Sequence, residues 1–118
     1  MSDVAPRFGD DGLVTAVVQD ADTAEVLMVA HMNREAWEAT LRTRRATFFS
    51  RSRQRLWEKG ETSGNRMHLR TVRIDCDGDA VLLQVHADGP ACHTGARTCF
   101  FTELEDVSEA GNANTKVD

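Results

Sequence analysis

A strict alternation over residues 72–77 constrains the fold more than any other feature of this sequence. Apolar side chains and Cys76 occupy every second position, and charged side chains occupy the positions between them. This period of two is typical of a β-strand, in which successive side chains point to opposite faces. The segment therefore predicts a strand with Asp75 and Asp77 on one face and Cys76 on the other.

Further short apolar segments, separated by turn-forming clusters, predict more strands at 13–19, 26–32, 47–50, 56–58, 81–86 and 98–104. One segment has helical periodicity instead. Asn33 is a suitable N-cap, Glu35 lies in the first turn, and Ala36, Trp37 and Leu41 give a buried face, so we predict a helix over 34–43. The expected fold class is a small, mostly-β α+β fold with one clear helix.

The chain has 118 residues, enough for one domain. We expect a loose segment at 1–12, a domain over 13–106 and a disordered tail at 107–118. The longest apolar run, 26–30, is too short to span a bilayer, and no basic residue followed by an apolar stretch marks the start as a signal peptide. We therefore expect a cytoplasmic location with no membrane partner. In that reducing compartment three cysteines, an odd number, argue against a disulfide framework.

Charge is distributed unevenly along the chain. The net charge is −5, yet ten of the fourteen Lys and Arg residues lie between Arg42 and Arg73, where Glu58 and Glu61 are the acids. An acidic chain with one basic segment predicts an anionic ligand held at one place, and not a chain that binds nucleic acid.

Three candidate groups of functional residues stand out. Asp75, Asp77 and Asp79 are hard oxygen donors suited to Mg²⁺, although the spacing does not fit an EF-hand and a solvated acidic turn is the competing interpretation. Cys76, Cys92 and Cys99 are soft donors suited to zinc. Three protein ligands would leave the fourth position on zinc for water, whose pKa zinc lowers from 15.7 to about 7. Buried inert cysteines are the alternative.

The third group is basic and lies between the predicted strands. Arginine gives bidentate contacts to phosphate, serine adds donors, and glycines let backbone N–H groups approach a ligand. We therefore predict substrate-binding residues, with an ordinary solvated basic face as the alternative, at Arg51, Ser52, Arg53, Lys59, Glu61, Thr62, Ser63, Gly64 and Asn65. His93, beside Cys92, is the candidate general acid and base.

Four stretches in this order closely resemble the phosphoribosyl-AMP cyclohydrolase family: Ser50-Arg-Ser-Arg53, Leu56-Trp-Glu-Lys-Gly-Glu-Thr-Ser-Gly-Asn65, Asp75-Cys-Asp-Gly-Asp79 and Gly89-Pro-Ala-Cys-His-Thr-Gly95. The resemblance runs from about Leu27 to Phe100. It implies an intertwined homodimer of small α+β subunits, with zinc on Cys76, Cys92 and Cys99 shared between the two chains.

The resemblance also implies Mg²⁺ on Asp75, Asp77 and Asp79, and hydrolysis of the N1–C6 bond of the adenine ring of phosphoribosyl-AMP in histidine biosynthesis. The product is the formimino-imidazole-carboxamide ribotide. The substrate's two phosphates suit the basic segment. Two other interpretations stay open. One is a structural-zinc RNA-binding module, since Arg residues flank Phe48 and Phe49. The other is a zinc deaminase of another purine nucleotide, although no H-x-E with a following C-x-x-C is present.

Overall fold

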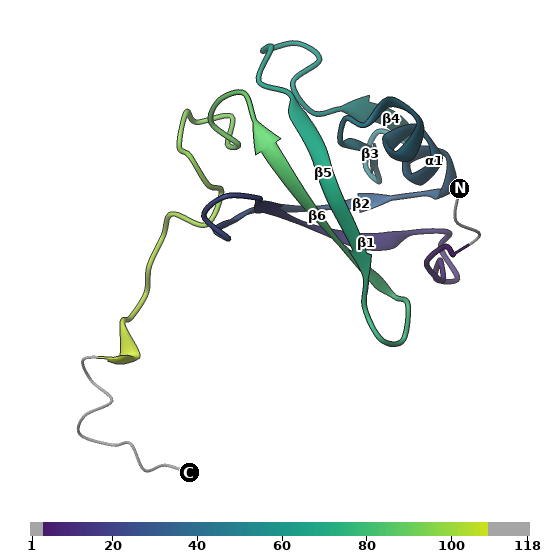
Figure 1. The fold of residues 1–118 in the computed structure, drawn as a ribbon, viewed down its shortest axis with the longest axis horizontal. Helices are drawn as coiled ribbons and strands as arrows, with labels where there is room; N and C mark the ends of the chain where they lie inside the picture. Colours follow the sequence, from purple (N-terminus) through teal and green to yellow (C-terminus); the bar gives the residue numbers. More distant parts are fainter. Residues whose placement is uncertain (1–3, 109–118) are drawn as a thin grey trace.

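The computed structural model describes residues 4–108, which form two small sheets and one helix (Figure 1). The elements, in chain order, are β1 (Val14–Asp20), β2 (Val26–Met32), α1 (Arg34–Thr43), β3 (Thr47–Ser50), β4 (Arg55–Glu58), β5 (Met67–Ile74) and β6 (Ala80–Ala87). The predicted mostly-β fold with one helix is therefore confirmed for the described chain.

The larger sheet has the strand order β2-β1-β6-β5. β1 pairs antiparallel with β2 and parallel with β6, whereas β5 and β6 form an antiparallel hairpin, so the sheet is mixed. Because β6 runs the full length of the sheet, the loop before it and the loop after it lie at opposite ends (Figure 1). This separation of the two loops decides where the candidate ligands lie.

The core lies between one face of this sheet and the layer made by α1, β3 and β4. Alternate residues of β1 and β6, such as Val14, Val18 and Leu83, are fully buried on that face. Phe48 of β3 is fully buried against them. A four-stranded sheet with one covered face leaves the other face to solvent, which accounts for the alternating burial along β1 and β6.

The helix begins and ends where local chemistry predicts. The Asn33 side chain accepts a hydrogen bond from the Ala36 N–H (2.8 Å), and Arg44 ends the helix in the left-handed conformation. The fully buried Thr40 hydroxyl donates to the Thr47 carbonyl (3.1 Å) and accepts from the Thr47 N–H (3.0 Å), which fixes α1 against β3.

Two of the strand predictions are wrong: one strand ends earlier than predicted, and another is not formed in the described chain. β5 ends at Ile74, so residues 75–79 form a turn and the alternation of the sequence does not continue into them. The predicted strand over 98–104 is absent from the described chain. Cys99 donates to the Leu27 carbonyl at the edge of β2 (2.8 Å), but the residues that follow are exposed and have no strand alongside them.

The chain before β1 contains no helix or strand between residues 4 and 12, yet it contacts the fold. Pro6 is buried, Phe8 packs on the edge of the core, and Arg34 lies over the Phe8 ring at 4.8 Å from its centroid. Residues 1–3 of the predicted loose segment and 109–118 of the predicted tail lie outside the described residues. Within the described residues, no helix has the length and hydropathy needed to cross a membrane.

Candidate functional site

The three aspartates gather in the turn that joins β5 to β6. Asp75, Asp77 and Asp79 are exposed, and one carboxylate oxygen from each lies within 4.8 Å of the others. The turn is closed by Gly78, whose φ of 81° suits glycine, and by the Asp75 carboxylate, which accepts from the Asp79 N–H (3.1 Å). The predicted aspartate cluster is thus assembled by the turn and not by a strand face.

The cluster is electrostatically frustrated without a cation. Burial opposes ionisation of Asp75, but hydrogen bonds from Asp79 and from the Ala80 N–H hold the pKa of Asp75 below its usual value. Hydrogen bonds to Asp77 and Asp75, and the negative charges of these two residues, raise the pKa of Asp79. Three convergent oxygen donors that repel one another fit a hard divalent ion such as Mg²⁺.

Two of the three cysteines meet in the segment that follows β6. Cys92 is half-buried and Cys99 is exposed. The Thr94 hydroxyl donates to the Cys92 sulfur (3.1 Å) and, with smaller contributions from the Thr94 N–H and the neighbouring Cys99 thiol, lowers the pKa of Cys92. Desolvation and the contact with Cys92 raise the pKa of Cys99. A pair of adjacent thiols, one favouring the thiolate, fits a soft metal such as zinc.

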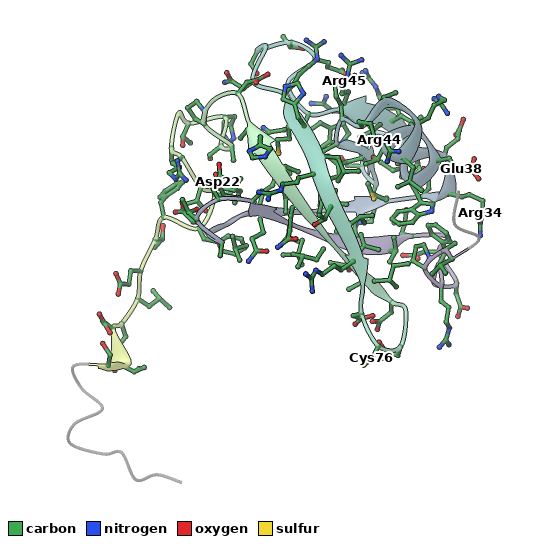
Figure 2. The ribbon with its side chains drawn as sticks, in the orientation of Figure 1. Asp22, Arg34, Glu38, Arg44, Arg45 and Cys76 are labelled. Atoms are coloured by element: carbon green, nitrogen blue, oxygen red, sulfur yellow. The ribbon has the colours of Figure 1, made fainter. Side chains whose placement is uncertain are left out.

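Cys76 does not join this pair within one chain. It lies in the turn before β6, at the tip of the β5–β6 hairpin (Figure 2), while Cys92 and Cys99 follow the other end of that strand. A strand of this length spans about 23 Å, and two thiolates on one zinc lie less than about 5 Å apart. One chain therefore presents two half-sites: the Cys92–Cys99 pair, and Cys76 beside the aspartate cluster.

A cavity of about 600 Å³ lies between β3, β4 and the loop after β4. Ser52 and Arg53 from the β3–β4 turn line it, together with Glu61, Thr62 and Ser63 from the loop. Five of the nine predicted substrate-binding residues thus surround one cavity. Five further residues, which were not in the predicted substrate-binding set, complete the lining: Ser50, Arg55, Trp57, Glu58 and Gly60.

The arginines and acids of this region are unequally paired. Glu58 is held by Arg66 (Nε to Oε2, 2.8 Å) and Arg45 (3.1 Å), and Glu61 lies 3.6 Å from Arg55. Arg51 and Arg53 have no ion pair among residues 4–108. Since the acids are neutralised and two cations are not, the cavity and its rim favour an anion.

The other predicted residues lie beside the cavity or between the sites. Arg51 is exposed at the turn, and Gly64 and Asn65 lie at the end of the loop, all outside the cavity lining. Lys59 is also outside it, and its positive charge acts on Cys92 and Cys99 instead, favouring their thiolate forms. His93 is exposed next to Cys92. Lys59 thus connects the basic loop to the thiol pair.

Sequence reasoning missed two arginines that position these segments. Arg97 bonds Glu25 through its Nε and Asp20 through Nη2 (3.2 Å), which ties the Cys92–Cys99 segment to the turn between β1 and β2. Arg7 contacts the aspartate turn, because its N–H donates to the Gly78 carbonyl (2.7 Å) and its Nη1 to the Asp77 carbonyl (3.1 Å). Neither partner is near in sequence, so no local pattern points to these contacts.

The chain is similar to known proteins over most of its length. Residues 28–101 match the family model described as phosphoribosyl-AMP cyclohydrolase. A phosphoribosyl-AMP cyclohydrolase of Erythrobacter litoralis is 63% identical over 101 residues, which cover 86% of this chain and 81% of the relative. One from Bordetella petrii is 55% identical over 115 residues, covering 97% and 83%.

The histidine biosynthesis bifunctional protein HisIE of Thermus thermophilus is 64% identical over 100 residues, which cover 85% of this chain but 47% of that longer protein. The family match includes the Cys92–Cys99 segment, the aspartate turn and every residue that lines the basic cavity. The chain therefore belongs to the phosphoribosyl-AMP cyclohydrolase family.

Proposed function

We propose that this chain is a hydrolase of histidine biosynthesis that opens the adenine ring of phosphoribosyl-AMP at the N1–C6 bond. The observation that supports it most is the basic cavity, because Arg53, which has no ion pair among residues 4–108, and the hydroxyl groups of the lining suit a nucleotide phosphate. Membership of the cyclohydrolase family supports the same substrate. We place the enzyme in the cytoplasm, where the pathway's phosphorylated substrate would be available.

Two metals suit the donor sets of the site. Cys92 and Cys99 of one chain, with Cys76 of a second copy, would hold zinc, and Asp75, Asp77 and Asp79 would hold Mg²⁺. Zinc, when bound, lowers the pKa of water so that a nucleophile is available at neutral pH. Mg²⁺, when bound, offsets phosphate charge. The distance between Cys76 and the Cys92–Cys99 pair supports a homodimer in which each zinc site takes residues from both chains.

Different side chains of this chain have different roles in the hydrolysis. Arg53 and Ser52 bind phosphate in the cavity, and the hydroxyls of Thr62 and Ser63 orient the ribose. His93, exposed beside the thiol pair, gives the proton that N1 needs when the N1–C6 bond breaks. Trp57 packs on the buried Phe48 ring (5.1 Å between centroids) and also lines the cavity, where it limits the space available to the substrate.

Incubation of the purified protein with phosphoribosyl-AMP tests the proposal, with ring opening followed by absorbance. We expect turnover that a zinc chelator abolishes, and an Arg53→Ala variant whose KM rises at least about tenfold, because a charge-assisted phosphate contact is lost. Arg42→Ala is the matched control, since Arg42 is exposed on α1 outside the cavity. Release of ammonia in place of the ring-opened product would support a deaminase and contradict the proposal.

A further inference from the structure

The segment after the thiol pair is the most exposed apolar part of the described chain. We call residues 100–108 the C-terminal arm; it runs away from the sheet (Figure 1), without regular secondary structure over 100–106 and with helical backbone at 107–108. Four large apolar side chains of the arm are exposed: Phe100 (61%), Phe101 (56%), Leu104 (95%) and Val107 (66%). Such a concentration of exposed apolar groups marks an interaction surface.

We propose that the C-terminal arm docks along the outer edge of β5 of a second copy of this chain. Among the described residues, the arm and the outer edge of β5 each lack a neighbouring strand that the other could supply. The sequence of the arm is typical of a strand, yet no strand of the described part of the chain lies beside it. β5 is an edge strand, and among residues 4–108 its outer side is occupied only at its start, where Leu69 donates to Arg44 (2.8 Å) and Met67 accepts from Ala46 (2.9 Å). An unpaired strand edge is a template for another chain.

Charge complementarity favours this pairing. The arm has three acidic residues, Glu103, Glu105 and Asp106, and no Lys or Arg. The open part of β5 presents two exposed arginines: Arg70, which already lies 3.6 Å from the Asp22 carboxylate, and Arg73, which has no ion pair among the described residues. An acidic, apolar segment and a basic edge strand with the half-buried Val72 would bury apolar surface and pair their charges in one contact.

The geometry of the two half-sites places the arm beside this edge. If Cys99 meets Cys76 of a second copy, a step that rests on the proposed function, the arm begins next to the end of that copy's β5. Residues 100–104 then span about 16 Å when extended, the same length as residues 70–74. The arm leaves its own sheet at β2, the opposite edge from its own β5, so a second copy is the partner that this arrangement favours.

A dilution series in the analytical ultracentrifuge, with zinc in excess, measures the dimer dissociation constant. We expect Leu104→Ser to raise it at least about tenfold, because a buried leucine is lost from the interface. The fold should not change, since Leu104 is 95% exposed in its own chain. Val29→Thr is the matched control, because Val29 is 45% exposed on β2 outside the arm, and it should leave the constant within twofold.

Charge reversal tests the edge itself. Arg73→Glu, and separately Glu103→Arg with Glu105→Arg, should each weaken the dimer by roughly threefold, and their combination should restore much of the loss. Within residues 70–74, exchange of the amide hydrogens that do not bond β6 should be slow in the wild-type dimer and fast in the Leu104→Ser protein. A dissociation constant unchanged by Leu104→Ser, or equal exchange of these outward-facing amides in both proteins, would overturn the proposal.

These readouts do not depend on turnover, so the two proposals fail separately. If the protein opens phosphoribosyl-AMP but the arm variants leave the dimer dissociation constant unchanged, the proposed function stands and the docking surface is refuted. If the arm variants have the expected effects but the protein shows no turnover, the docking surface stands and the proposed function is refuted.

Discussion

Gly60 determines the shape of the basic cavity through its backbone alone. Its φ is +85°, and a Cβ at this position would meet the backbone of Asn65 and Arg66 at 2.4 and 2.5 Å, too close for any side chain. The Gly60 carbonyl also accepts from the Gly64 N–H (2.8 Å), which closes the loop that lines the cavity. A larger residue must therefore change the loop, and not only a rotamer.

We predict that Gly60→Ala lowers the free energy of unfolding by about 3 kcal/mol and raises the KM for phosphoribosyl-AMP, because the loop must move apart and the left-handed backbone is strained. Urea denaturation and steady-state kinetics measure the two effects. Gly12→Ala is the control, since Gly12 has a similar φ of +78° but nothing within 4 Å of the added Cβ. It should lose only about 1 kcal/mol, with KM unchanged. Equal effects of the two substitutions would refute the role of the close contact.

At the scale of elements, Asp20 links the turn between β1 and β2 to the Cys92–Cys99 segment. This carboxylate accepts from the N–H groups of Thr23 (3.0 Å) and Asp22 (2.8 Å) and pairs with Arg97 (3.2 Å). The Thr23 hydrogen bond is the largest of the causes that hold the pKa of Asp20 below 3.8. Stability from this ionised group is therefore present above pH 3.8 and is lost as the pH falls through the lowered pKa.

We predict that Asp20→Asn is less stable than the wild type by about 1–2 kcal/mol at neutral pH, with a gap that narrows as the pH falls below 3.8. Denaturant unfolding across an acid pH series measures this difference. Asp10→Asn should show a small, constant difference, because Asp10 is exposed and accepts no hydrogen bond among the described residues. If the difference in unfolding free energy between the wild type and Asp20→Asn stays constant as the pH falls, the ionised Asp20 carboxylate does not have this stabilising role.

Elements with local signals were predictable from the sequence, and those fixed by distant partners were not. The helix over 34–43 was predicted at both ends, since Asn33 caps its start within three residues. The end of β5 was not predicted. The strand stops at Ile74 because Gly78 and the Asp75 carboxylate close a turn over the next residues. The aspartate cluster was found through its composition, although the strand geometry used to explain it was wrong. The contacts of Arg97 join residues more than 70 positions apart.

At the scale of the whole molecule, the position of Cys76 makes a prediction about two chains. Cys76 lies at one end of β6 and the Cys92–Cys99 pair at the other, so a three-thiolate site needs one half-site from each of two copies. In a symmetric dimer this arrangement gives two sites, each with Cys76 from one chain and the pair from the other. A chain without Cys76 still supplies an intact pair, and a chain without Cys92 still supplies an intact Cys76.

We therefore predict that Cys76→Ala and Cys92→Ala are each inactive alone and regain activity when they are unfolded together and refolded as a mixture. Random pairing makes half of the dimers mixed, and each mixed dimer has one intact site and one that lacks both cysteines. The mixture should recover about a quarter of the wild-type turnover and of the wild-type zinc content. Cys92→Ala mixed with Cys99→Ala is the control: both remove the same half-site, so no pairing rebuilds it and no activity should return. Recovery in that control, or its absence in the first mixture, would mean that the thiolates do not combine across two chains.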